Sequence, residues 1–169
     1  MALIMIDKLD AARRQLETAA LLYFNDQDIV SIHTLTAAAY EIVESLAQRR
    51  GRSTLAQSSL LKLLSDDLAK EVRSAMRVPQ NFLKHADRDP DAQLEFEPDF
   101  TEFLLLDAMS TYAQITGEIP RLFDVFSKWF AIQKPHSLNL GPDEKRTLLE
   151  AHKNFGAMSR SAFLKKSLQ

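Results

Sequence analysis

The stretch DIVSIHTLTAAAYEIVESLAQRRG, residues 28–51, decides the fold class of this chain. Its apolar and small residues recur at spacings of three and four, which is the period of one face of an α-helix. These residues are Ile29, Ile32, Thr36, Ala39, Tyr40, Val43 and Leu46. Asp28 is a good N-cap, and Gly51 suits the left-handed position that often follows the last turn. The sequence therefore predicts a helix from about Asp28 to Arg49.

The same helical period continues on both sides of this stretch. Further helices are predicted over residues 7–24, 53–64, 65–78, 100–116, 119–133 and 143–166, the last as one or two helices broken near Gly156. Only four glycines occur in 169 residues, and no stretch shows the apolar–polar alternation of a strand. We therefore predict an all-α fold, a single up-down bundle of six to seven helices that forms one domain over residues 1–169.

Composition excludes several classes of protein. The chain has no cysteine, which excludes disulfides, thiolate zinc sites and a cysteine nucleophile and fits the reducing cytoplasm. The formal net charge of −2 gives no general attraction for nucleic acid, so any such contact must come from a local patch. No apolar run approaches the length of a membrane span, and residues 1–7 are too short for a signal peptide. We expect a cytoplasmic protein with no membrane partner.

One long irregular segment, residues 87–99, is rich in aspartate, glutamate and proline and is predicted to be an acidic loop. Loops of this length in compact domains are often functional. Its alternating aspartates resemble calcium ligands, but Ala92 stands where an EF-hand needs glycine and Pro98 where it needs glutamate. An EF-hand is therefore excluded. Solvated, turn-forming aspartates are the first interpretation, and a looser divalent-ion site that includes His85 is the alternative.

Standard catalytic motifs are absent from the chain. It has no Walker loop, no nucleophile elbow, no dinucleotide fingerprint and no His-Glu-x-x-His. We expect no cofactor and no resident metal. At the other end, residues 157–169 carry Arg160, Lys165 and Lys166, and these basic turns are expected either to fray or to dock a partner.

The segment QNFLKHADRDPD, residues 80–91, is the best candidate for a functional site. Asn81 and His85 are four residues apart, so they project from the same face of a helix. With Lys84 they combine hydrogen bonding, positive charge and a group that titrates near neutral pH. This combination is suited to hold or cleave a phosphodiester. The alternative interpretation is an ordinary polar helix end.

Three further polar residues are candidates for the same site. His33 lies beside the buried stripe of its helix, where it either forms a structural hydrogen bond or faces His85. Asp107 falls among apolar residues of its helix and should be paired, because burying a lone carboxylate is costly. We expect its partner to be Lys84, His85 or His33. Asp87, at the start of the acidic loop, completes the set of candidate ligand-binding residues.

Residues Gln80 to His85 resemble the R-N-x-x-x-H motif of the HEPN superfamily, which consists of small all-helical bacterial and archaeal domains. The phrases SIHTL (31–35), AAYE (38–41) and NFLKHAD (81–87) also resemble a group of uncharacterised bacterial proteins. Many HEPN members are metal-independent ribonucleases, whereas others bind RNA or nucleotides without cleavage, and they commonly form dimers in which two motifs share one cleft. The resemblance implies a polar role for Asn81 and a catalytic role for His85.

This chain departs from the HEPN motif at one position, because Gln80 stands in place of the arginine that stabilises phosphate charge. Lys84 supplies a point charge but no bidentate fork. The resemblance therefore implies a homodimer that binds RNA or a nucleotide with weak or absent ribonuclease activity, more binding protein than enzyme. Two alternatives are a protein-interaction module that uses the aromatic stripe of residues 119–130 or the basic C-terminal turns, and a bundle that binds a small molecule or metal.

Overall fold

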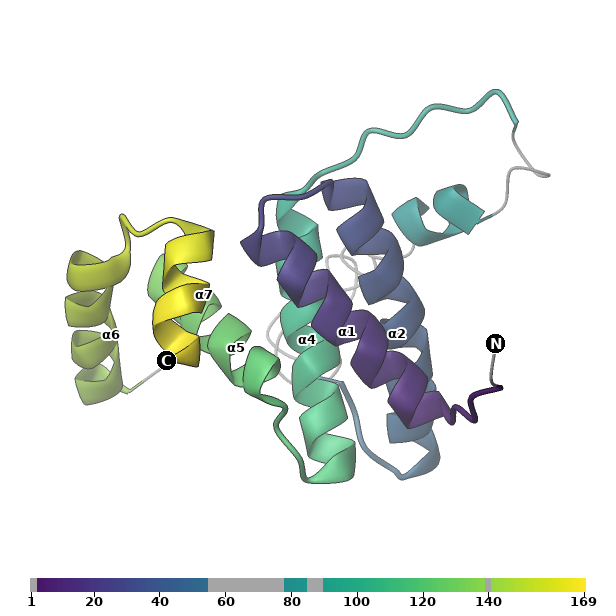
Figure 1. Cartoon of the computed structure of the whole chain (residues 1–169), viewed down its shortest axis with the longest axis horizontal. Coiled ribbons are helices and arrows are strands. Elements are labelled where there is room, and N and C mark those ends of the chain that lie inside the picture. Colours follow the sequence, from purple (N-terminus) through teal and green to yellow (C-terminus); the bar gives the residue numbers. More distant parts are fainter. Residues whose placement is uncertain (1–2, 55–77, 85–89, 139–140) are drawn as a thin grey trace.

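The computed structural model describes residues 3–54, 78–84, 90–138 and 141–169 (Figure 1). Every regular element in these ranges is a helix, which confirms the all-α prediction. The main helices are α1 (Lys8–Phe24), α2 (Ile29–Arg49), α4 (Asp99–Thr116), α5 (Arg121–Gln133), α6 (Pro142–Phe155) and α7 (Arg160–Leu168). Residues 78–84 are also helical. The helices predicted between residues 53 and 77 lie outside the described ranges.

The ends of α2 follow the capping signals predicted for it, and Asp7 caps the start of α1. Asp7 accepts the backbone N–H of Asp10, and Asp28 accepts that of Ser31, both at 2.7 Å. These bonds satisfy donors that a helix start otherwise leaves free. Gly51, which follows α2, has a φ of +67°, as expected for a glycine just beyond a helix.

One predicted boundary is wrong. The sequence predicts a helix that begins at Ile119 and Pro120, but α5 begins at Arg121 with Pro120 as its N-cap in an extended conformation. A residue before proline is driven away from helical geometry, so Ile119 cannot join the helix. It is 68% exposed instead of lying on the buried stripe.

Helix α2 packs against both α1 and α4, and these three helices form the main body (Figure 1). The four-residue connection makes α1 and α2 antiparallel. α2 and α4 run in the same direction, because His33 near the start of α2 contacts Thr101, and Arg50 after its end donates to the carbonyl of Ile115. α5 leads away from the end of α4 and carries α6 and α7, with α6 outermost.

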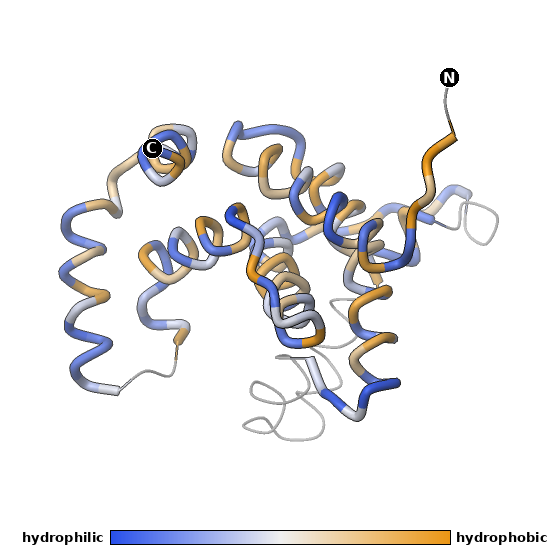
Figure 2. Tube along the Cα trace, turned by 60° about the horizontal axis from the view of Figure 1, so that its bottom comes forward, coloured by the Kyte–Doolittle hydropathy of each residue, from blue (hydrophilic) through white to orange (hydrophobic). Residues whose placement is uncertain are grey.

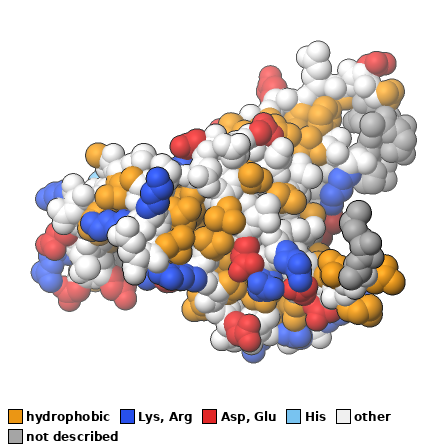
Figure 3. Space-filling model, viewed as in Figure 1, with side chains coloured by type: hydrophobic (Ala, Val, Ile, Leu, Met, Phe, Trp, Pro, Cys, Tyr) orange, Lys and Arg blue, Asp and Glu red, His pale blue; other side chains and the backbone are white. Residues whose placement is uncertain are grey.

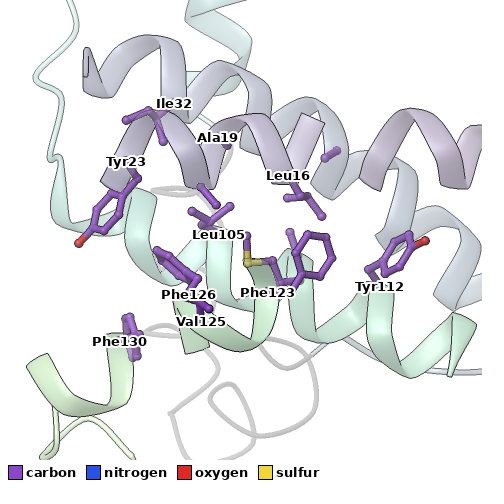
Figure 4. Close-up of a cluster of buried hydrophobic side chains, with 14 of the residues drawn as sticks. Leu16, Ala19, Tyr23, Ile32, Leu105, Tyr112, Phe123, Val125, Phe126 and Phe130 are labelled. Atoms are coloured by element: carbon purple, nitrogen blue, oxygen red, sulfur yellow. The ribbon is translucent and has the colours of Figure 1, made fainter. Parts of the chain in front are cut away.

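The hydrophobic core lies where α1, α2, α4 and α5 meet (Figure 4). Along each helix the hydrophobic positions alternate with hydrophilic ones, whereas the segment of residues 3–6 before α1 is hydrophobic throughout (Figure 2). Its residues Leu3 and Met5 are almost fully exposed.

The aromatic stripe of α5 belongs to the core and is not an exposed interaction surface. Phe123, Phe126 and Trp129 are 1%, 0% and 6% exposed. The prediction that this stripe docks a partner is therefore wrong, because α1 and α7 already cover it. The basic C-terminal turns form α7, which buries Phe163 and Leu164.

Candidate functional site

The helical residues 78–84 are fixed on α2 by two side-chain contacts. Gln80, which is 7% exposed, donates from its amide nitrogen to the carbonyl oxygen of Ala37 at 3.4 Å. Lys84 Nζ lies 3.0 Å from a carboxylate oxygen of Glu41. Gln80 and Lys84 are one helical turn apart, and so are their partners Ala37 and Glu41 on α2. The short helix of residues 78–84 therefore lies against one face of α2.

The candidate residues of this segment divide into two groups. Gln80 points inward and serves as an anchor, whereas Asn81 and Lys84 lie on the exposed side. The position that carries arginine in the resembled motif is therefore buried against a backbone carbonyl. His85 and Asp87 lie outside the described residues, so their roles stay predictions from the sequence.

His33 is almost fully buried, with 1% of its surface exposed. Its Nδ1 lies 3.0 Å from the hydroxyl of Thr101, and the ring of Phe96 meets the imidazole edge to face, with 5.2 Å between centroids. The other ring nitrogen, Nε2, has no hydrogen-bond partner among the residues that the structure describes. Burial lowers the pKa of His33 below its ordinary value of 6.5, so the imidazole is neutral at pH 7.

Asp107 is buried, as predicted, but two of its predicted partners are wrong. Its carboxylate accepts the Thr111 hydroxyl at 3.2 Å. It also lies close to the hydroxyl of Tyr40, whose pKa is raised by burial and then by this carboxylate. Lys84 pairs with Glu41 instead, and His33 bonds Thr101.

Helix geometry explains why His33 and Asp107 do not meet. Thr101 and Asp107 are six residues apart on α4, which is about 9 Å along its axis. A side chain that bonds Thr101 through Nδ1 is therefore too far away to pair with Asp107. The third predicted partner, His85, is outside the described ranges.

The polar residues that are buried as whole residues in the described chain lie on α2, on α4, and in residues 51–54 and 78–84 beside them. The residues concerned are His33, Thr36, Thr54, Gln80, Thr101, Asp107 and Thr111. Sequence reasoning missed three contact residues of the candidate site, namely Phe96, Thr101 and Glu41. A signal existed for two of them: Phe96 is an aromatic residue within an acidic loop, and Thr101 occupies a helical position next to apolar ones.

A second polar cluster joins α1, α4, α5 and α7. Glu102 accepts the Tyr23 hydroxyl at 2.7 Å and lies 3.1 Å from Lys134 and 3.6 Å from Arg160. The Arg160 guanidinium also stacks over the Tyr23 ring at 4.0 Å. Burial first, and the Glu102 carboxylate second, raise the pKa of Tyr23. The phenol therefore keeps its proton and donates a hydrogen bond to Glu102. The cluster satisfies its own charges and docks α7.

Within the described ranges, no three of the side chains that commonly bind metals lie close enough together to hold an ion. None of the described helices is both long and apolar enough to cross a membrane. Comparison of the chain with protein-family models, with curated proteins and with solved structures gave no match.

Proposed function

We propose that this chain is a non-catalytic binding protein for RNA or a nucleotide, and that Asn81 and Lys84 contact phosphate. The observation that supports this most is the anchoring of Gln80 on the Ala37 carbonyl. With Gln80 turned inward, residues 78–84 present Asn81 and Lys84 to solvent. An amide and an ammonium group on one exposed turn suit a phosphate oxygen.

The ion pair between Lys84 and Glu41 is compatible with this role. The side chains are 32% and 56% exposed, and exposed pairs of this kind contribute only about 0–1 kcal/mol. A phosphate, which carries more charge, can therefore replace the Glu41 carboxylate. On the face seen in Figure 3, acidic and basic side chains are interspersed, so recognition by a local cluster is favoured over a broad basic surface.

Two further parts of the proposal are a homodimer, which the resemblance to the HEPN superfamily supports, and a cytoplasmic location, which the cysteine-free sequence supports. Two copies related by a two-fold axis would bring their 78–84 segments to one interface. Cleavage is not part of the proposal, because the residue in the place of the motif's arginine is an uncharged, buried anchor. Mass determination by light scattering during gel filtration tests the dimer.

The test of function is fluorescence anisotropy with a labelled single-stranded RNA of mixed sequence. Lys84→Ala is expected to weaken binding about tenfold and to reduce the slope of log affinity against log salt by about one. Glu41→Gln is expected to strengthen binding roughly two- to fivefold, because it removes the competitor for Lys84. The labelled RNA should stay intact in a buffer that contains a metal chelator.

Lys128 and Asp124 supply the matched control. They form an exposed ion pair on α5, with 2.7 Å between the charged atoms, and α5 is not the element that holds residues 78–84. Lys128→Ala and Asp124→Asn should leave RNA affinity unchanged. If the wild-type protein binds neither RNA nor mononucleotides, or if the two lysine variants weaken binding equally, the proposed site is wrong. RNA cleavage that His85→Ala abolishes would overturn the non-catalytic assignment.

A further inference from the structure

A buried nitrogen without a partner is the feature of this structure that most needs a ligand. His33 Nε2 is enclosed, and no group in the described part of the chain forms a hydrogen bond with it. Leaving such a group unpaired costs on the order of 1–3 kcal/mol, and native proteins rarely do so without a functional reason. The other nitrogen of the ring is held by Thr101, so the ring is oriented while one of its hydrogen-bonding sites stays unused.

His33 lies on the same side of α2 as the proposed phosphate-binding residues. His33, Ala37 and Glu41 are spaced by four, so their side chains fall within about 80° of each other around the helix axis. Ala37 and Glu41 are the residues that hold Gln80 and Lys84. About 12 Å along the axis separates His33 from Glu41, which suits a ligand with one group at each end.

Phe96 covers His33 from a segment that is weakly held. In residues 90–98 only Leu94 and Phe96 are half-buried, while Glu95 and Glu97 point to solvent. The described part of the chain offers no backbone hydrogen bond to residues 91–96. Figure 1 shows this stretch passing over the end of the bundle. Segments with few buried contacts and few hydrogen bonds open at low free-energy cost.

We propose that His33 and Phe96 form a binding site for a nucleobase. The base takes the place beside the imidazole, Nε2 hydrogen-bonds to its edge, and the displaced Phe96 ring stacks on its face. A neutral imidazole can serve either way: Nε2 donates if Thr101 donates to Nδ1, and accepts if Nδ1 donates to Thr101. The inference rests on the proposed function, since the same ligand carries the phosphate held by Lys84.

The test compares a single-stranded RNA with an abasic oligonucleotide that has the same number of phosphates. Base stacking and a base hydrogen bond act only on the first, whereas phosphate contacts act on both. We expect His33→Phe and Phe96→Ala each to weaken RNA binding about tenfold and to leave abasic binding unchanged. Thr34→Ala, an exposed neighbour on α2, is the control and should change neither affinity.

A spectroscopic measurement on the unaltered protein covers the case in which His33→Phe fails to fold. The nitrogen-15 resonance of His33 Nε2 should shift on addition of RNA and stay in place with the abasic oligonucleotide. The base site is wrong if His33→Phe and Phe96→Ala affect RNA and abasic binding equally and the resonance does not move. If Lys84→Ala still weakens RNA binding in that case, the phosphate site stands. If neither ligand binds the wild-type protein, both proposals are wrong.

Discussion

At the scale of single residues, position 80 shows how one side chain changes the role of a whole segment. Gln80 is 7% exposed and bonds a carbonyl of α2. A guanidinium here would enter a place with a backbone oxygen and little water, where an unpaired charge is costly. Glutamine is therefore matched to its environment as an anchor, and the segment depends on Lys84 for positive charge.

His33 makes the stability of the protein depend on pH. Burial lowers the pKa of His33 in the folded state. As pH falls, its imidazole therefore takes up a proton near pH 6.5 in the unfolded chain but stays neutral at that pH in the folded protein. Unfolding is thus favoured as pH falls below about 6.5, and the contribution of His33 to stability is complete above that value. Urea unfolding at pH 7.5 and 5.5 should show a larger loss for the wild type than for His33→Gln.

The control for this experiment is His136→Gln, because His136 is exposed. This variant should keep the pH dependence of the wild type. If His33→Gln loses as much stability between the two pH values as the wild type does, the titration of His33 does not contribute to the pH dependence of stability.

At the scale of elements, α7 is held by a polar cluster as well as by apolar burial. Arg160, at its first position, bonds Asp26 at 3.2 Å, stacks on Tyr23 and lies near Glu102. The side chain of Glu102 is only 13% exposed; it accepts a hydrogen bond from Tyr23 and forms ion pairs with Lys134 and Arg160. Hydrogen bonds to a partly buried charge are stronger than those to a neutral group. The short helix α7 therefore depends on one carboxylate of α4.

Glu102→Gln should destabilise the docking of α7 by about 2 kcal/mol, because Lys134 and Arg160 lose their shared counter-charge. Hydrogen exchange of the α7 amides is the measurement, and their exchange should accelerate more than that of α2. Glu118→Gln, at an exposed position after α4, is the control and should change nothing. If hydrogen exchange accelerates equally in α2 and α7, Glu102 stabilises the whole fold and not the docking of α7 in particular.

At the scale of the whole molecule, one aromatic cluster connects the three-helix body to the C-terminal helices. Phe126 of α5 meets Tyr23 at 5.3 Å and Phe24 at 6.2 Å, and Phe24 stacks on Phe163 of α7. Since these rings come from α1, α5 and α7, the cluster lies at the junction of the two parts. Both parts should therefore unfold together.

Phe126→Ala should lower the free energy of unfolding by about 3–5 kcal/mol, because it leaves a cavity at this junction. Chemical denaturation followed by circular dichroism and by Trp129 fluorescence is the measurement, and both signals should shift together. Ile119→Ala, at a 68% exposed position, should change stability by less than about 0.5 kcal/mol. Two separate transitions in the wild type would contradict the single cooperative unit.

The sequence predicted the helices well because period and capping are local properties. Asp7, Asp28 and Gly51 act within one turn of themselves, and the stripes of α1 and α2 are readable from spacing alone. The candidate site was predicted less well. Burial of Asp107 followed from its helical position, but the partners of Lys84 and His33 did not.

Those partners depend on which helices become neighbours and at what register. Nothing local in the sequence says that Thr101 stands opposite His33, or that Glu41 stands opposite Lys84. Phe96 reaches His33 across more than sixty residues of chain, from a segment whose composition indicates only an acidic loop. Charge and polarity alone favoured a pairing with Asp107 that the register of α4 does not allow.

The sequence by itself determined the helical class, the capped ends of α1 and α2, and the amphipathic faces, because these arise from interactions between residues a few positions apart. Only the tertiary structure decided that the aromatic stripe of α5 is buried, that Gln80 is an anchor, and that one nitrogen of His33 is enclosed without a partner. These properties arise from packing between distant segments, where burial and hydrogen bonding are set by the neighbour that a side chain meets.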